Sequence, residues 1–418
     1  MKNLFLTALY ILMLGMGSAV KAQFDFTHYN THNCSLPSDY ILGGVAVDNN
    51  NNKWFGTESG VVKFDGTTWT VFTTSDGLPD NYILCIAVDK NNNVWVGTDG
   101  FGVAKYNGSI WTTYTVTDGL CDNGIHYIAG DTDGSVWFAS WSGGVSKYNG
   151  STWITYTTEL PLDNGFPASV NYITVDAFGN KWFGTDMGLS KFDGTTWTTF
   201  DTTTAGLDSL IDMKILTIAI DSNNNKWLGT FSGITQLSST NTWVKNYRFY
   251  DNLKPYSVED IDIDSKGNIW LGLWNSYTFV GNISKYDGTS WVSNQTILPT
   301  DSSQQKIFRL AVDNNDIVWI AMDYGVYKLF DASGIRNYSN NSSFNVYPNP
   351  TSDVLNIELI SSTDLENQNI EIYNTLQKVG EYEFPKGTTT FSIPIEKYTQ
   401  GLYFIRYGNI TKKIIIEN

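Results

Sequence analysis

Short apolar runs separated by polar turns recur along most of the chain and define one unit that is written seven times. Each unit opens with an almost wholly apolar run, such as residues 84–88, as expected of a strand that is covered on both faces. The run ends at an Asp, whose carboxylate can bond the amides of the following turn, and a Trp follows six residues later. Successive Trp residues of this kind are 41 to 49 positions apart, a period typical of stacked supersecondary units such as propeller blades. The pairs are Asp48/Trp54, Asp89/Trp95, Asp131/Trp137, Asp176/Trp182, Asp221/Trp227, Asp264/Trp270 and Asp313/Trp319.

Each unit predicts four short strands, which we name a to d in chain order. Strand a is the apolar run, strand b carries the Trp, and strand c follows a Gly-containing turn, as at residues 61–64. An Asp-Gly or Asn-Gly pair, as at residues 65–66, then marks a hairpin. No segment shows a 3.6-residue period, so the sequence predicts an all-β fold, with a seven-bladed β-propeller over residues 23–338. Strand d opens on a second Trp in six units: Trp69, Trp111, Trp153, Trp197, Trp243 and Trp291.

The N-terminal segment of the repeat region resembles an isolated strand d. Residues 26–29 come before the first complete unit, whereas the last unit has Asp313 and Trp319 but no second Trp. We therefore expect the N-terminal strand to complete the last blade. That arrangement fastens the ring and removes two sheet edges.

Both ends of the chain depart from the repeat. Residues 1–22 predict a secretory signal peptide, with Lys2, an apolar run over 4–16 and small residues before Gln23. This run is shorter than the ~20 residues that span a bilayer, and no later stretch is apolar enough to do so, so we expect no transmembrane span in the mature chain. After residue 338, a polar linker at 339–346 leads to a small all-β domain at 347–418. Its expected strands lie near 354–359, 370–373, 391–393, 402–405 and 413–416.

The charge balance excludes one large class of partners. The 418 residues include 42 acidic and 26 basic side chains, for a net charge of -16. Nucleic-acid binding depends on Lys and Arg displacing counterions, so no nucleic-acid partner is expected. The three cysteines are too few for a disulfide framework.

The repeats resemble the two-component-regulator propeller repeats of Bacteroidetes. The similarity rests on the succession of Asp, turn, Trp-x-Gly-Thr, Gly and Lys-Phe/Tyr-Asp/Asn, as at residues 48–65 and 176–193, and it covers about residues 24–340. In that family such propellers often form the periplasmic ligand sensor of membrane-bound hybrid kinases. This chain has too few residues for a kinase, so we do not carry the sensor role over.

The C-terminal residues resemble the type A sorting domain of the type IX secretion system, an immunoglobulin-like sandwich. The resemblance implies that the secretion machinery is a partner and that the protein passes through the periplasm to the outer surface or the medium. The usual Gly after Tyr373-Asn374 is displaced in this chain. The residues of the sorting motif are Tyr347, Pro348, Asn349, Pro350, Gly401, Tyr403, Lys412 and Lys413.

Aromatic residues recur in the turns between strands b and c, where small polar residues are usual. Together with a few polar groups, aromatic rings suit a sugar ring or a peptide side chain. Asp260 and Arg309 begin their strands on the same face and could form a charged pair. The alternative is that the rings fold onto neighbouring blades and that this pair is structural. The aromatic candidates are Phe101, Trp141, Phe231, Trp274, Tyr277 and Tyr324.

No cofactor and no metal site is expected. The turn Asp89-x-Asn91-x-Asn93 imitates the start of an EF-hand loop, but position 12 is Gly100 rather than the Glu that completes the calcium shell. We therefore interpret it as a hairpin turn.

Histidine offers little support for catalysis. His126 begins a strand a and is the only plausible general base of its type, but no partner for it is evident in the sequence. His28 and His32 lie near Cys34, and proximity alone does not make a metal site.

The expected function is that of an exported, non-catalytic binding or scaffold protein, monomeric, which recognises a glycan or a protein through its b–c turns. Two alternatives stay open. One is a propeller enzyme, such as a lyase acting on a polysaccharide or a cyclic ester, in line with the seven-bladed virginiamycin B lyase family. The other is an extracellular partner of a sensor kinase.

Overall fold

A computed structural model describes residues 24–140, 144–157, 162–163, 166–200, 210–251, 254–294, 306–331, 344–347, 354–359, 369–374, 378–383, 390–407 and 410–416. The contacts divide the chain into two compact units, Met1–Ser333 and Gly334–Asn418. No helix within the described ranges is long and apolar enough to cross a membrane. The predicted signal peptide lies outside these ranges.

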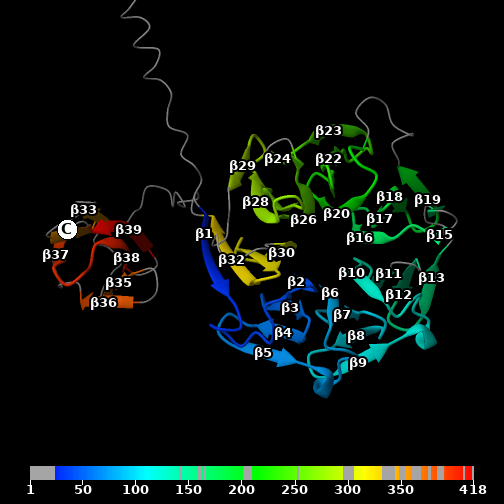
Figure 1. The fold of residues 1–418 in the computed structure, drawn as a ribbon, viewed down its shortest axis with the longest axis horizontal. Coiled ribbons are helices and arrows are strands. Elements are labelled where there is room, and N and C mark those ends of the chain that lie inside the picture. Colours follow the sequence, from blue (N-terminus) through cyan, green and yellow to red (C-terminus); the bar gives the residue numbers. More distant parts are fainter. Residues whose placement is uncertain are drawn as a thin grey trace, which may run out of the picture. The chain divides into compact units, whose positions relative to one another are not determined.

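The described part of the first unit contains seven four-stranded antiparallel sheets, one for each repeat (Figure 1). The first three are β2(Gly44–Val47)–β3(Lys53–Thr57)–β4(Gly60–Phe64)–β5(Trp69–Phe72), β6(Ile83–Val88)–β7(Val94–Thr98)–β8(Val103–Tyr106)–β9(Trp111–Tyr114) and β10(Ile125–Gly130)–β11(Val136–Ser140)–β12(Val145–Tyr148)–β13(Trp153–Tyr156). The next two are β16(Val170–Val175)–β17(Lys181–Thr185)–β18(Gly188–Phe192)–β19(Trp197–Phe200) and β20(Ile215–Ile220)–β21(Lys226–Thr230)–β22(Gly233–Leu237)–β23(Trp243–Tyr247). The last two are β26(Ser257–Ile263)–β27(Ile269–Asn275)–β28(Val280–Tyr286)–β29(Trp291–Asn294) and β30(Ile307–Val312)–β31(Val318–Met322)–β32(Gly325–Asp331)–β1(Phe24–Tyr29).

Small elements join some of the sheets. Two 3₁₀ turns, Thr74–Asp76 and Val116–Asp118, follow the first two outer strands. Two short hairpins stand between sheets: β14(Leu162–Asp163) with β15(Phe166–Pro167), and β24(Tyr250–Asp251) with β25(Lys254–Pro255).

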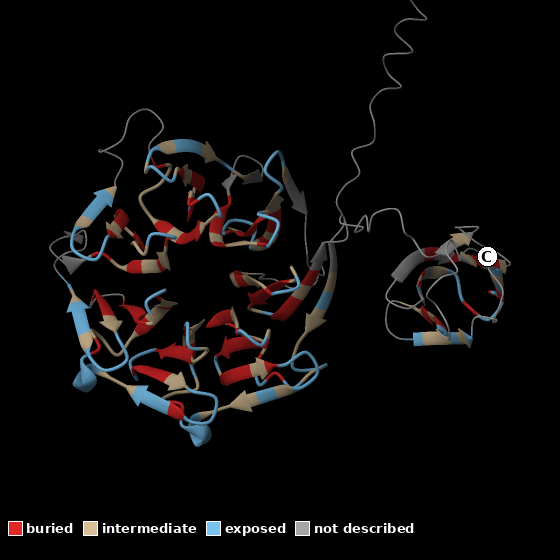
Figure 2. Cartoon of the chain, turned by 180° about the vertical axis from the view of Figure 1, so that it is seen from behind, coloured by how far each residue is buried: buried red, intermediate tan, exposed pale blue. Residues whose placement is uncertain are grey.

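The sheets of the first unit are arranged in a closed ring. The first strand of each sheet lies nearest the centre (Figure 1), and β2 contacts both β6 and β30. Burial falls towards the outside of the ring (Figure 2): in the first sheet the second strand, β3, is fully buried, whereas the outer strand β5 has no buried residue. Strand β1 pairs with β32 from Phe24↔Asp331 to Tyr29↔Val326. The outer strand of the last sheet therefore comes from the other end of the repeat region.

A hydrogen bond joins the Asp and the Trp of each repeat. In all seven described pairs the indole Nε1 donates to the Asp Oδ2, at 2.9 to 3.1 Å. The other oxygen of Asp48 accepts from the amides of Asn50 and Asn52, both at 2.9 Å. One carboxylate thus caps the a–b turn, as predicted, and also fixes the Trp of strand b, which the sequence did not suggest. Buried indole N–H groups need such an acceptor.

The other repeat residues pack around the Trp. In six sheets, the Lys of strand c lies over the Trp ring of strand b in the same sheet. In the first sheet, Lys63 Nζ is 5.5 Å from the Trp54 ring centre. The Gly of Trp-x-Gly lies where the next sheet packs closely. A Cβ at Gly56 would stand 2.7 Å from Cγ2 of Ile83, so the close approach of the two sheets requires a residue without a side chain.

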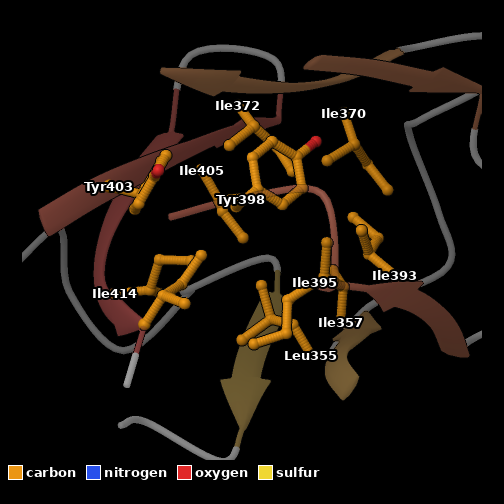
Figure 3. Packing of buried hydrophobic residues seen from close by; sticks show 11 residues of the cluster. Leu355, Ile357, Ile370, Ile372, Ile393, Ile395, Tyr398, Tyr403, Ile405 and Ile414 are labelled. Atoms are coloured by element: carbon orange, nitrogen blue, oxygen red, sulfur yellow. The ribbon is translucent and has the colours of Figure 1, made fainter. Parts of the chain in front are cut away.

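The second unit has two antiparallel sheets around one core (Figure 3). The first is β33(Phe344–Tyr347)–β34(Val354–Leu359)–β37(Thr390–Pro394), and the second is β36(Lys378–Glu383)–β35(Asn369–Tyr373)–β38(Gly401–Tyr407)–β39(Ile410–Ile416). Tyr403 of the predicted sorting motif is buried in this core, and its hydroxyl donates to the carbonyl of Thr399 at 2.9 Å. Gly401 begins β38. The core residues are Leu355, Ile357, Ile370, Ile372, Ile393, Ile395, Tyr398, Tyr403, Ile405, Ile414 and Ile416.

Of the other six residues of the sorting motif, three belong to strands and three lie outside the described residues. Pro348, Asn349 and Pro350 lie outside the described residues, as does most of the predicted linker. The backbones of Tyr347, Lys412 and Lys413 belong to β33 and β39.

Candidate binding face

The b–c turns and the segments that enter strand a lie on one face of the ring, which we call the b–c face. In the second sheet, Ile83 at the start of β6 pairs with Thr98 at the end of β7. The start of β6 and the turn after β7 therefore lie at the same end of the sheet. Corresponding pairs, such as Ile125↔Ser140, recur in the other sheets.

Four of the predicted aromatic residues are exposed on this face. Phe101, Phe231, Tyr277 and Tyr324 expose 56%, 45%, 62% and 44% of their surface. They belong to four different sheets, so the structure spreads them around the ring instead of gathering them in one place. The described residues include seven exposed aromatic side chains, and all except Phe178 lie on the b–c face: Tyr82, Phe101, Phe178, Phe231, Tyr277, Phe279 and Tyr324.

The sixth sheet departs from the sequence prediction. Trp274 was expected in the turn, but it lies within β27, paired with Ser257 and Gly281, because this hairpin is longer than the others. Its half-buried ring packs edge-on against Phe279, with centroids 6.1 Å apart. Phe279, which the sequence reasoning did not select, occupies the turn at φ +58 and is 47% exposed. Trp141 lies outside the described residues.

Asp260 lies inside the ring and not among the exposed turns. Only 3% of its surface is exposed. Its Oδ1 accepts from the hydroxyl of Thr217 at 2.9 Å, and its Oδ2 accepts from the amide of Leu310 at 2.9 Å. Burial raises the pKa of this carboxyl, although the charge of Arg309 opposes the shift. Asp260 therefore joins β20, β26 and β30.

Arg309 is half-buried and reaches towards the opposite side of the ring. Its guanidinium lies 5.4 Å from the ring centre of Tyr127 in β10 and 5.9 Å from that of Tyr172 in β16. Its Nη1 donates to the carbonyls of Glu259 at 3.2 Å and Phe308 at 3.3 Å. No ion pair joins it to Asp260 among the described side chains. Separate hydrogen bonds and ring contacts therefore take the place of the charged pair that the sequence left open, although each charge still shifts the pKa of the other group.

Asp262, two residues further along β26, also links β26 to β30. Its Oδ2 accepts from the amide of Val312 in β30 at 2.7 Å, and its Oδ1 accepts from the amide of Ile263 at 2.8 Å. Burial raises the pKa of Asp262 to about 7 from its ordinary value of 3.8.

Asp262→Asn is expected to change how stability depends on pH. As pH rises from about 4 to 7, the unfolded carboxyl releases its proton before the native one does, so the wild type loses stability over this range. Asparagine has no charge to bury, and its amide oxygen can still accept from Val312. In urea titrations the variant should match or trail the wild type at pH 5 and exceed it by about 2 kcal/mol at pH 8. A stability difference that is the same at both pH values would contradict this account.

His126 is held by the backbone of the neighbouring sheet. Its Nε2 donates to the carbonyl of Val170 at 2.6 Å. Burial lowers the pKa of the imidazole to about 4, so the ring is neutral near pH 7. This contact ties β10 to β16.

The Asn-rich turns have the hydrogen bonds of hairpins. Asp89 Oδ1 accepts from the amides of Asn91 and Asn93, and its Oδ2 accepts from the indole of Trp95. Both oxygens thus face N–H donors. Within the described residues, no three or more His, Cys, Asp or Glu side chains are grouped to hold a metal ion.

Two family models match parts of the chain. Residues 345–417 match the secretion system C-terminal sorting domain, and residues 77–100 match the two component regulator propeller. The chain combines a regulator-propeller repeat with a C-terminal sorting domain. Both resemblances predicted from the sequence are confirmed. The sorting domain directs secretion by the type IX system, through the periplasm, to the cell surface or the outside.

Solved structures share the fold at low identity. A streptogramin B lyase is 17% identical with a TM-score of 0.60, covering 73% of this chain and 97% of that one. PorZ, a surface component of the type IX secretion system of Porphyromonas gingivalis, is also 17% identical, with a TM-score of 0.58, and the alignment covers 91% of this chain and 60% of PorZ. The WD40 β-propeller domain of Doa1 is 13% identical with a TM-score of 0.53, covering 74% of this chain and 97% of that one. These neighbours confirm the all-β propeller class. No curated protein sequence matches the chain.

Proposed function

We propose that this secreted propeller is a non-catalytic binding protein that recognises a glycan or a protein through its b–c face. The observation that carries the proposal is the one-sided placement of exposed rings: among the described residues, six of seven exposed aromatic side chains stand on this face. Rings exposed by chance would be shared between the two faces. Loops on a rigid scaffold are where binding residues concentrate, and apolar rings kept in water favour an occupant.

The chemistry of the face suits a ligand with both apolar and hydrogen-bonding groups. Carboxylates occur in the same turns as two exposed rings: Asp99 is two residues before Phe101, and Asp323 directly precedes Tyr324. Lys214 Nζ lies 5.4 Å from the ring centre of Phe231. A sugar or a side chain could stack on the ring while the carboxylate of the same turn accepts a hydrogen bond from its O–H or N–H group.

The test compares rings on the two faces of the propeller. The mature chain is screened on an array of glycans and on immobilised surface proteins, and its strongest ligand is titrated against Phe101→Ala, Phe231→Ala and Tyr277→Ala. At least one of these variants should lose about tenfold in affinity, equivalent to about 1.4 kcal/mol. The matched control is Phe178→Ala, which removes a 77% exposed ring from the opposite face and should bind like the wild type. Equal binding by all four variants would refute the choice of face.

A further inference from the structure

One sector of the b–c face gathers side chains from the first and last sheets, which the closed ring brings together. Tyr40, in the segment that enters β2, packs edge-on against Phe308 of β30, with ring centroids 5.1 Å apart. Its carbonyl accepts from the amide of Glu58 in the β3–β4 turn. Asp323 and Tyr324 form the β31–β32 turn, and the amide of Asp323 donates to the carbonyl of Lys306, which enters β30. We call these five residues, Tyr40, Glu58, Phe308, Asp323 and Tyr324, the Tyr40 cluster.

A bulge presents Phe308 to this cluster. The register of β30 against β31 shifts between Ile307 and Arg309, which leaves Phe308 unpaired as the extra residue. The register of β26 shifts in the same way around Glu259. The same shift recurs in six of the seven described sheets, so it belongs to the repeat, and only the residue at the bulge differs from sheet to sheet. The two residues at the bulges here are a ring and a carboxylate.

The cluster has more negative than positive charge. The nearby cation Lys306 is already engaged, because its Nζ lies 3.5 Å from Glu259 Oε2. Glu58 accepts from the hydroxyl of Ser38 at 2.9 Å, and Asp323 Oδ2 accepts from the amide of Lys306 at 3.1 Å. Among the described residues, neither Glu58 nor Asp323 forms an ion pair.

One acceptor in the cluster has no donor. Oδ1 of Asp323 is buried from solvent and receives no hydrogen bond from any described residue. Burial raises the pKa of this carboxyl, and the charges of Asp323 and Glu58 add to the burial that raises the pKa of the Tyr40 hydroxyl. An unsatisfied buried carboxylate oxygen is costly and calls for an explanation. A cation bound beside Asp323 would offset the charge of this carboxyl, and a turn of the carboxyl group about its last bond would bring Oδ1 to the bound N–H.

We propose that the Tyr40 cluster binds an organic cation, the ammonium or guanidinium group of a lysine or arginine side chain or of an amino sugar. Tyr324, 44% exposed, and Tyr40 offer ring faces to the cation, and Asp323 and Glu58 offer carboxylate acceptors. A neutral sugar would leave Glu58 without a cation and Asp323 with only the charge of Lys306, which Glu259 shares. This inference rests on the proposed binding function and specifies the chemistry of one sector of the same face.

The test uses probes that differ only in charge. Calorimetric titration of the mature chain compares the acetylated, amidated pentapeptide Gly-Lys-Gly-Lys-Gly with the same peptide containing norleucine in place of lysine. A second pair is the trimer of glucosamine and the trimer of N-acetylglucosamine. The charged member of at least one pair should bind at least about tenfold more tightly than its neutral partner and lose affinity as salt increases. Which charged probe binds more tightly distinguishes a polypeptide source of the cation from an amino-sugar source.

Two variants locate the site. Asp323→Asn should weaken the charged probe about tenfold, and Tyr324→Ala, at an exposed position, should weaken it about threefold. The control Asp65→Asn removes an exposed carboxylate from a c–d turn, on the opposite face, and should bind like the wild type. Equal binding of the charged and neutral probes, or an Asp323→Asn variant that binds like Asp65→Asn, would overturn the cation site.

Failure of this inference can be told apart from failure of the proposed function. A neutral glycan that binds the wild type and loses affinity in Phe101→Ala, but not in Asp323→Asn, would keep the b–c face as the binding surface and remove the cation site. Absence of any ligand that depends on the b–c face would remove both.

Discussion

Deletion of residues 345–418 is expected to abolish the appearance of the protein outside the cell while leaving the first unit folded. The deleted segment spans the matched sorting domain. It belongs to a separate compact unit with a core of its own, whose residues take no part in the hydrophobic clusters of the ring. The truncated chain should therefore accumulate in the periplasm as a folded propeller, and immunoblots of medium, surface and periplasmic fractions measure the change.

The control for this deletion keeps the tail but disturbs the ring mildly, through Phe178→Ala, and should be exported normally. A sufficiency test attaches residues 345–418 to an unrelated periplasmic reporter, which should then reach the outside. Normal export of the truncated chain would show that the tail is not the signal that sends this protein out.

Much of the ring could be predicted because the residues that define the strands and turns of each repeat lie close together in the sequence. The second Trp of six repeats begins the outer strand in the structure; Trp69, for example, is the first residue of β5. The short apolar runs and the Asp-Gly turns are short-range signals, and they act within a few residues. The hydrogen bond between Asp48 and Trp54 explains why the six-residue spacing is repeated, but the spacing alone did not reveal it.

The site was harder to predict, since it depends on how sheets meet. Spacing placed Trp274 in a turn, but two additional pairs of residues lengthen the hairpin and move Phe279 to its tip. The sequence left open whether Asp260 and Arg309 form a charged pair on the face, because it gives the row of a residue but not the direction of its side chain. Arg309 instead extends towards Tyr127. Gly44, at φ +80, allows this, since a Cβ there would stand 2.5 Å from Cγ of Arg309.

The Tyr40 cluster shows the same limit of sequence reasoning. Tyr40 and Phe308 lie at opposite ends of the repeat region, and only closure of the ring brings their rings together. Closure was expected from the missing second Trp of the last repeat. The bulge at Phe308, and the unpartnered oxygen of Asp323, have no counterpart in a pattern of apolar and polar positions.

Tyr29→Ala is expected to destabilise the first unit by about 3 kcal/mol, because this side chain fastens the closing strand to its neighbours. Tyr29 ends β1, and its ring lies 6.0 Å from that of Trp319 in its own sheet. It also lies 5.2 Å from Trp69 and 5.9 Å from Phe64, both in the first sheet. Removal of the ring thus weakens the last sheet and its seam with the first. Local loss of β1 would in turn expose the edge of β32.

Unfolding by urea, followed through tryptophan fluorescence, measures this effect on the ring alone, since all 15 Trp precede residue 334 and so belong to the first unit. Tyr29→Phe is the matched control: it keeps the ring contacts and should stay within about 1 kcal/mol of the wild type. Phe178→Ala removes a ring of similar size that is 77% exposed, and should change stability by no more than about 0.5 kcal/mol. If Tyr29→Ala unfolds at the same urea concentration as Tyr29→Phe, β1 does not fasten the ring through this contact, and closure depends on the backbone pairing with β32.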